Sequence, residues 1–213
     1  MHAGFPCFTP ELHQLLHRAA KESPIIDVVG GPLLASGMAL LLKLGFGYLL
    51  RDGLLDAEQS RKAQAFFREN FVFIDPTAPT GECYYQGRFL IRTRKAQDNM
   101  NVVLRFCPQP EALFVDTPWG RSLNPLAVTQ TEVVDEEEAD LLEQEGDNID
   151  LVIRFKNIDA IINLIGRERV DMVGLLLENV VQLTGNVGHL FKLGALAKNI
   201  ETELGLATVM PSQ

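Results

Sequence analysis

Apolar and polar residues alternate, or recur at helical spacing, most regularly between residues 148 and 201. Near the start of this stretch Leu151, Ile153 and Phe155 occupy every second position. Successive side chains of a β-strand point to opposite faces, so this spacing places the three on one face. The pattern predicts a half-buried strand over residues 149–155.

Two helices follow in the same stretch. The first carries isoleucines at the i, i+3, i+4 and i+7 positions that share one side of a helix, and it ends at Gly166. These residues are Ile158, Ile161, Ile162 and Ile165. The run 170–181 predicts a second helix, whose apolar stripe consists of Val173, Leu176, Leu177 and Val180.

The stretch closes with a short strand, a turn and an apolar helix. Residues 182–184 read as the strand, Gly185 and Asn186 turn the chain, and residues 187–198 form the helix. Upstream, patterns of the same kind predict five further elements. They are a helix over 57–70, a strand over 71–74, a hairpin with strands at 84–94 and 101–106, and a strand over 126–134.

The run from Val28 to Leu50 is the most apolar part of the chain and contains Lys43 and five glycines. It is long enough to span a bilayer, but a charge at mid-bilayer costs about 2.5–3.5 kcal/mol. We therefore predict a helix that packs against the body of the protein or touches a membrane surface. Because it is apolar nearly all round, it needs cover from the fold, a second subunit, a ligand or a membrane.

The formal net charge of −9 comes from one interval of the chain. Between Glu132 and Asp147 there are nine acids and no basic residue, so the remaining acids equal the 19 lysines and arginines. We expect this acidic interval to be a solvated loop with a short helix near residues 139–143. The rest of the chain lacks the basic stripe that phosphate binding requires, which argues against a nucleic-acid partner.

Arginines recur at alternate positions in the first hairpin strand. Arg88, Arg92 and Arg94 fall on one strand face with Leu90 between them. We expect a solvated sheet face here, since charged residues on one side of an antiparallel strand usually face water.

Motifs that would indicate an enzyme or a metal site are missing from the sequence. It contains no nucleophile elbow, no zinc-protease signature and no dinucleotide fingerprint. Cys7, Cys83 and Cys107 are widely spaced, which predicts neither a disulfide framework nor zinc, and favours a cytoplasmic location. His13 and His17 have i, i+4 spacing but no evident third ligand, so we expect a solvated helix face, no metal and no cofactor.

The succession strand, helix, helix, strand, Gly-Asn turn and apolar helix, with the segment from Leu183 to Leu193 at its end, resembles the sterol carrier protein type-two family. The resemblance covers residues 148–201 well and residues 84–106 loosely. It implies an α+β fold in which a curved, mainly antiparallel sheet is covered by helices around an apolar tunnel. Residues 1–70 would then be an N-terminal helical extension, and residues 71–213 the sterol-carrier-like domain.

This resemblance and the surplus of apolar helices predict a non-enzymatic protein that binds or transfers a lipid. The ligand would be a fatty acyl chain, a sterol-like molecule or an acyl-CoA, and a membrane surface would be a transient partner. The predicted lining of the tunnel is Ile153, Phe155, Ile162, Ile165, Leu176, Val180, Leu190 and Phe191. The alternative is an accessory or scaffold protein that uses the same fold to form a homodimer or to dock on an enzyme or a membrane.

Overall fold

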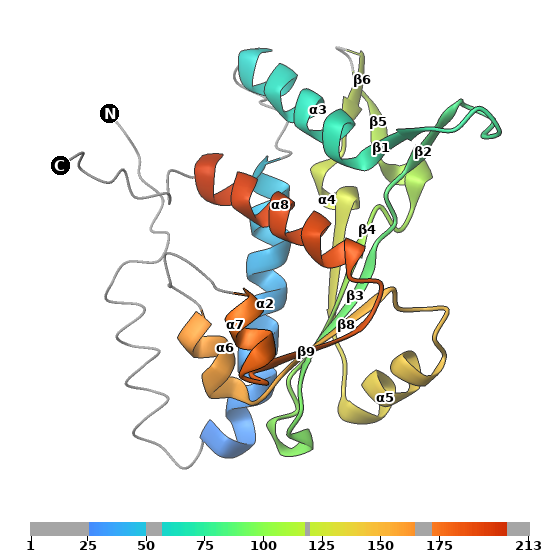
Figure 1. The fold of residues 1–213 in the computed structure, drawn as a ribbon. Coiled ribbons are helices and arrows are strands. Elements are labelled where there is room, and N and C mark those ends of the chain that lie inside the picture. The colour runs from blue at the N-terminus through green and yellow to red at the C-terminus, as the bar shows by residue number, and fades with distance from the viewer. Residues whose placement is uncertain (1–25, 50–56, 118–119, 165–171, 204–213) are drawn as a thin grey trace, which may run out of the picture.

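The structure, a computed structural model, describes residues 26–49, 57–117, 120–164 and 172–203. In these residues helices surround a five-stranded sheet, and two smaller sheets of two strands each lie beside it (Figure 1). The large sheet is mixed but mostly antiparallel. The predicted α+β class is confirmed.

The five-stranded sheet has the strand order β7-β4-β3-β8-β9. Its strands are β3 (Arg88–Thr93), β4 (Asn101–Phe106), β7 (Thr129–Val133), β8 (Leu151–Phe155) and β9 (Val181–Gly185). β3 and β8 pair in parallel at the centre, and all other neighbours are antiparallel. The predicted hairpin is confirmed as β3 and β4, joined through the 3-10 helix η1 (Ala96–Asp98). The two strands predicted within residues 148–201 are confirmed as β8 and β9.

Alternation along the strands gives the sheet two different faces. Phe89 lies opposite Leu104 on β4 and Leu151 on β8, and all three are fully buried on the first face. On the second face, Arg88 and Arg92 alternate with the buried Leu90. The core on the first face is larger and includes aromatic side chains from several elements.

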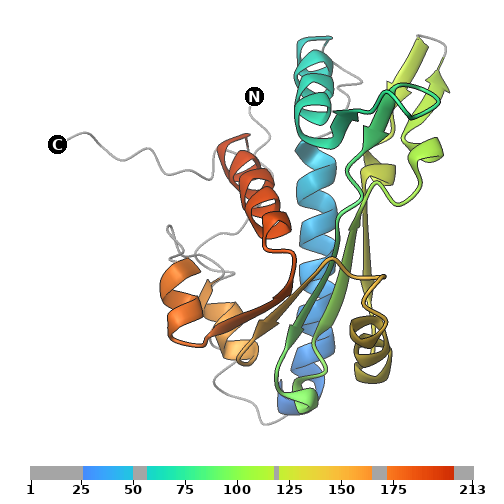
Figure 2. The ribbon, with the colours of Figure 1, turned by 45° about the vertical axis from the view of Figure 1, so that its right-hand side comes forward.

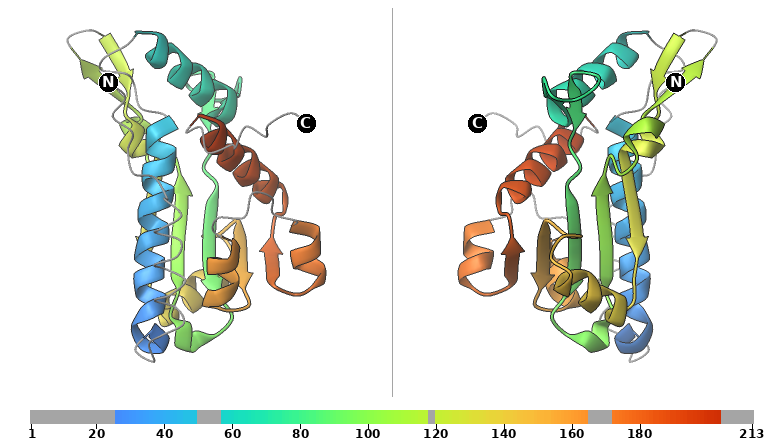
Figure 3. Two further views of the ribbon diagram at one scale, coloured as in Figure 1. Left: turned by 90° about the vertical axis from the view of Figure 1, so that its left-hand side faces the viewer. Right: turned by 90° about the vertical axis from the view of Figure 1, so that its right-hand side faces the viewer.

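Helix α2 (Ile26–Leu49) covers part of the first face (Figure 3). Its small residues Ala35 and Ala39 are buried in the core, while Leu33 and Leu40 remain exposed. Gly31 passes so close to η1 that a β-carbon there would collide with the carbonyl oxygen of Asp98. The predicted helix packed against the body of the protein is thus confirmed.

Four more helices lie on this side of the molecule: α3 (Ala57–Phe71), α6 (Ile158–Leu164), α7 (Met172–Leu177) and α8 (Gly188–Glu203). Asn157 caps α6, as its side-chain oxygen accepts a hydrogen bond from the Ala160 amide at 3.0 Å. Helix α7 is shorter than the run 170–181 predicted, because the chain turns at Asn179, whose φ is +58°, and Val181 already belongs to β9.

The second face is covered by α5 (Glu136–Gln144), which lies on the opposite side of the sheet from α8 (Figure 2). Asp135 caps this helix by accepting a hydrogen bond from the Glu138 amide at 2.9 Å. Ala139 is fully buried and packs in a second apolar cluster with Leu90 and Val103. The short helix predicted near residues 139–143 is therefore confirmed as part of a longer one, whereas the prediction of a solvated loop around it is wrong, because residues 136–144 pack on the sheet as a helix.

The prediction of a solvated arginine face is also wrong for Arg92. Its side chain is 6% exposed and forms ion pairs with Glu136, Asp140 and Glu143 of α5. A buried guanidinium needs such partners, since an unpaired charge is costly to remove from water. The acidic interval supplies the charges that this strand face requires.

The remaining elements lie at the end of the sheet where the hairpins β1–β2 and β5–β6 project (Figure 1). They are β1 (Val72–Ile74), β2 (Glu82–Tyr84), η2 (Pro110–Ala112), β5 (Phe114–Thr117), β6 (Gly120–Leu123) and α4 (Pro125–Val128). The strand predicted over 126–134 is correct only from Thr129 onward. Before it, Asn124 and Pro125 start a short helix, in which the Leu126 amide donates to Asn124 Oδ1 at 3.3 Å.

Candidate functional site

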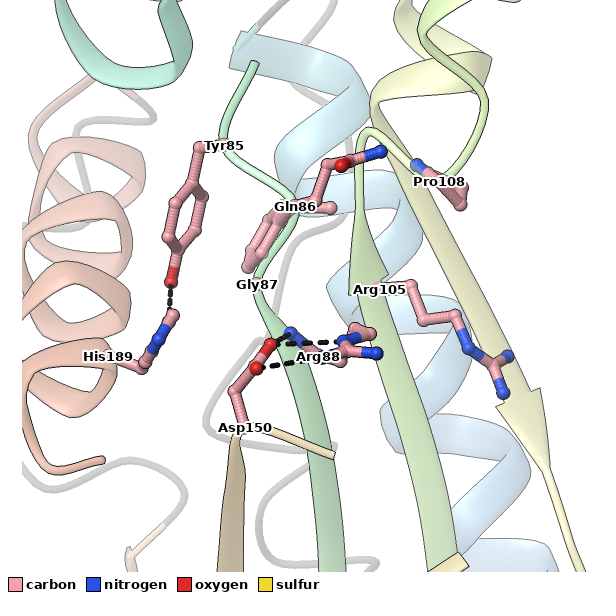
Figure 4. Close-up of a pocket in the computed structure, with 9 residues that line it drawn as sticks. Tyr85, Gln86, Gly87, Arg88, Arg105, Pro108, Asp150 and His189 are labelled. Carbon is pink, nitrogen blue, oxygen red and sulfur yellow. Dashed lines mark hydrogen bonds and ion pairs between the residues drawn. The ribbon is translucent and has the colours of Figure 1, made fainter. Parts of the chain in front are cut away.

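One end of the large sheet brings four strand termini together. β3 and β8 are parallel and both begin at this end, while their antiparallel neighbours β4 and β9 finish there. Residues just before or after each strand therefore meet around a cavity of about 480 Å³ (Figure 4). Its lining consists of Tyr85, Gln86, Gly87, Arg88, Arg105, Phe106, Pro108, Asp150 and His189.

Asp150 and Arg88 form a closed ion pair in this cavity. Asp150 Oδ2 accepts from the Arg88 backbone amide at 2.8 Å and from Nε at 3.2 Å, and Oδ1 accepts from Nη2 at 2.9 Å. Burial acts to raise the pKa of Asp150, but the hydrogen bonds and charge of Arg88, with a contribution from His189, lower it below its ordinary value. The carboxylate is therefore ionised at neutral pH.

Tyr85 and His189 form a second pair. Tyr85 Oη lies 2.7 Å from His189 Nδ1, and the two rings stack with their centroids 5.6 Å apart. Phe89 meets the imidazole edge-on at 6.0 Å between centroids. Burial, and then the charge of Asp150, raise the pKa of Tyr85, so its phenol keeps its proton at neutral pH.

Glycine at position 185 allows His189 to reach this place. Gly185 ends β9 with φ of +112°, and a β-carbon there would collide with the Asp150 carbonyl oxygen. Because Gly185 has no side chain, the chain passes close to Asp150, and the Asn186 amide donates to that same oxygen at 2.9 Å. Asn186 Oδ1 then accepts from the Gly188 amide at 2.9 Å, which caps α8 and sets its first turn beside the cavity.

A second pocket of about 560 Å³ lies between α5 and the second face of the sheet. Arg92 Nη1 is 2.8 Å from Asp140 Oδ1 and 3.1 Å from Glu143 Oε2, and Arg92 also pairs with Glu136. Arg154 pairs with Glu143 as well. These ion pairs hold α5 on the sheet. Because the charged groups in the pocket already neutralise one another, they offer little to a ligand.

Seven of the eight side chains predicted to line a tunnel belong to described residues, and they do not come together in one lining. Ile153 is buried in its core, against which Phe155, Val180 and Leu190 pack. Ile162 is half-buried on α6. Leu176 and Phe191 are exposed, by 39% and 76%, and do not face inward as predicted.

Several sequence predictions concern residues outside the described ranges, namely Cys7, His13, His17, Ile165 and the helix end at Gly166. None of the seven predicted residues that the structure describes lines either of the two pockets above. The cavity residues Tyr85, Asp150 and His189 were not predicted as a site. A signal was present in the opposite charges of Arg88 and Asp150, but using it requires knowing that β3 pairs with β8.

Apolar side chains reach the surface around β9, which is an edge strand of the large sheet. Leu177 on α7 and Phe191 on α8 are 82% and 76% exposed. Half-buried Val180, three positions after Leu177, and Leu190, directly before Phe191, pack against the core. The first face is thus bordered by apolar surface where its helices α7 and α8 flank β9.

No family model, curated protein or solved structure matches this chain. In the described ranges no helix is both long and apolar enough to cross a membrane. The same residues contain no group of three or more histidine, cysteine or acidic side chains arranged to hold a metal ion.

Proposed function

We propose that this protein binds or transfers a lipid without catalysing a reaction on it. The observation that carries the proposal is the exposure of Leu177 and Phe191 at the border of the apolar first face. Such side chains gain free energy when an apolar partner covers them, at about 25 cal/mol per Å² of buried surface. An acyl chain or a similar ligand would provide that cover.

The arrangement of elements supports the same proposal. The succession β8, α6, α7, β9, α8 is the order on which the resemblance to the sterol carrier protein type-two family rests. The large sheet carries helices over its apolar face, as that resemblance implies. We propose a sterol-carrier-like fold, in which the ligand lies on the first face near α7, β9 and α8.

Native mass spectrometry of the purified full chain, combined with lipid extraction, tests this function. We expect the protein to retain a lipid from its host, because apolar surface that is uncovered forfeits dispersion contacts. A protein that carries no lipid and forms dimers at rising concentration would instead be the scaffold, since a second copy would then cover Leu177 and Phe191.

A matched pair of variants locates the ligand. Phe191→Asp places a carboxylate on the exposed side of α8, and we expect lipid retention to fall about tenfold or more, as burial of a phenylalanine contributes about 1.5–3 kcal/mol. Leu126→Asp makes the same change at another exposed position, on α4. It should leave retention unchanged. Equal retention by both variants would contradict a ligand beside α8.

A further inference from the structure

The cavity at the end of the sheet combines an aromatic floor with an ion pair. Tyr85 and Phe106 form part of the floor, are 9% and 0% exposed, and belong to the core of the first face. Asp150 and Arg88, which are partly exposed, add an ion pair to the lining (Figure 4). A site with these two parts suits the polar end of a molecule whose remainder is apolar.

Asp150 determines which polar end the cavity accepts. Its Oδ2 accepts two hydrogen bonds from Arg88, whereas Oδ1 accepts one. An ionised carboxylate offers about four acceptor positions, so Oδ1 keeps one for a ligand. A donor on the ligand would be bound there, whereas a carboxylate has no proton to donate to Oδ1 and finds Arg88 already paired.

Other cations near the cavity do not reverse this preference. Arg105 directs its guanidinium away from Asp150 (Figure 4) and pairs with Glu132 at 2.8 Å. Lys192 Nζ lies over the Tyr85 ring, 5.8 Å from its centroid, and is not part of the cavity lining. The charge of Arg88 is neutralised by Asp150 itself.

The first turn of α8 does not offer a phosphate site. The amide of Gly188 donates to Asn186 Oδ1, that of His189 to the Asn186 carbonyl, and that of Leu190 to the Val187 carbonyl. A helix N-terminus binds phosphate through amides that lack partners. These three amides are already used, so phosphate head groups are disfavoured.

His189 supplies the second contact. One ring nitrogen is held by Tyr85 at 2.7 Å, which leaves the other for a ligand. A hydroxyl both donates and accepts, so it can donate to Asp150 while it accepts from His189. A carboxylate can only accept, and an ether has no proton to donate.

We infer that this cavity is a head-group site for an uncharged, hydroxyl-bearing apolar ligand, with Asp150 as the acceptor of the hydroxyl proton and His189 as the second partner. The inference rests on the proposed lipid binding and narrows it to a class of ligand. A long-chain alcohol, a sterol or a phenol with an apolar tail shares this chemistry.

Three probes with the same tail test the inference: 1-dodecanol, 1-methoxydodecane and dodecanoate. Calorimetric titration of the full chain, stripped of lipid, should give 1-dodecanol a Kd about tenfold lower than either other probe, since a hydrogen bond to a charged group contributes about that factor. Dodecanol and its methyl ether binding equally, or dodecanoate binding most tightly, would overturn the head-group site. Failure of all three probes to bind would overturn the lipid function and the site together.

Two variants test whether Asp150 and His189 cause the preference for 1-dodecanol. Asp150→Asn leaves Arg88 without its carboxylate and adds amide donors, so the discrimination against dodecanoate should disappear. His189→Phe keeps a ring beside Tyr85, and the advantage of dodecanol over its ether should shrink severalfold. Each comparison is a ratio of the Kd values of two probes for one variant. A smaller folded fraction raises both Kd values by the same factor and leaves their ratio unchanged.

Asp116→Asn on β5 is the matched control. Its side chain is exposed and lies outside the cavity lining. Both ratios should keep their wild-type values in this variant. Wild-type ratios in Asp150→Asn and His189→Phe would overturn the assignment.

Discussion

On its first face the five-stranded sheet is covered by α2, α8 and other helices through apolar side chains, whereas on its second face α5 is held largely by ion pairs. The first face buries Phe89, Leu104 and Leu151 completely. The second buries Arg92 beside three carboxylates of α5. Both layers exclude water from the sheet, but by different interactions.

Apolar burial has no preferred direction, while an ion pair with hydrogen bonds holds its partners at fixed distances. A helix held by apolar contacts can shift and exchange one apolar neighbour for another at small cost. A helix held by Arg92 would lose specific partners if it moved. The exposed apolar residues and the cavity beside α8 accordingly lie on the side of the molecule that is better able to accommodate a ligand.

Among variants that compare the two faces, truncation of a side chain in the apolar core should lower the free energy of unfolding most. Phe89→Ala removes a fully buried ring at the centre of the sheet. We expect the free energy of unfolding to fall by about 3–5 kcal/mol, measured by urea denaturation, because of lost transfer energy and the cavity left behind. Phe73→Ala, at a ring that is 50% exposed, should cost clearly less. Equal losses would contradict the placement of the core under Phe89.

Removal of the buried charge of Arg92 should cause the second-largest loss of stability. Arg92→Met leaves Glu136 and Asp140 of α5 without their cation, while Glu143 keeps its pair with Arg154. We expect the free energy of unfolding, measured in the same way, to fall by about 2–3 kcal/mol. Fully buried pairs cost about 3–5 kcal/mol when broken, and the partial solvation of these carboxylates reduces that figure.

Arg105→Met is the companion variant, since the Arg105–Glu132 pair is more exposed. Its loss should stay below about 1 kcal/mol. If Arg92→Met were as stable as the wild type, the apolar contacts of Leu90, Val103 and Ala139 alone would hold α5.

Asp150→Asn should have the smallest effect on stability, about 1 kcal/mol at pH 7, because both members of its ion pair are partly solvated. The effect should depend on pH. Arg88 lowers the folded-state pKa of Asp150, so the ionised carboxylate stabilises the fold above its ordinary value of 3.8 and this contribution is lost as the pH falls through the lowered pKa. The stability difference between wild type and variant should thus be full at pH 7 and vanish in strong acid. A difference that is constant over this range would contradict the ion pair.

Local patterns predicted most of the elements correctly. β3, β4, β8 and α6 follow from alternation or helical spacing of residues that are neighbours in the chain, and Asn157 caps α6. These features depend on few residues, all visible together in the sequence. The short α4 also had a local signal, the pair Asn124-Pro125, which the alternation of the following residues obscured.

The packing of the acidic helix on the sheet and the cavity could not be predicted in this way. Glu136 belongs on the sheet because Arg92, 44 positions earlier, lies beneath it. Asp150 and Arg88 meet only because β8 pairs in parallel with β3. Charge patterns show which residues need partners, but the partner is chosen by strand order, and that order depends on contacts between distant parts of the chain.

The parallel pairing of β3 and β8 also governs when the cavity can come into existence. Arg88 and Asp150 are 62 positions apart, and closing a loop of that length costs roughly 4 kcal/mol of chain entropy before any contact repays it. The β3–β4 hairpin closes a much shorter loop and can form first. During synthesis, which proceeds from the N-terminus, β8, β9 and α8 also emerge after the other strands of the large sheet. We therefore expect a growing chain to gain its binding site only after His189 has emerged.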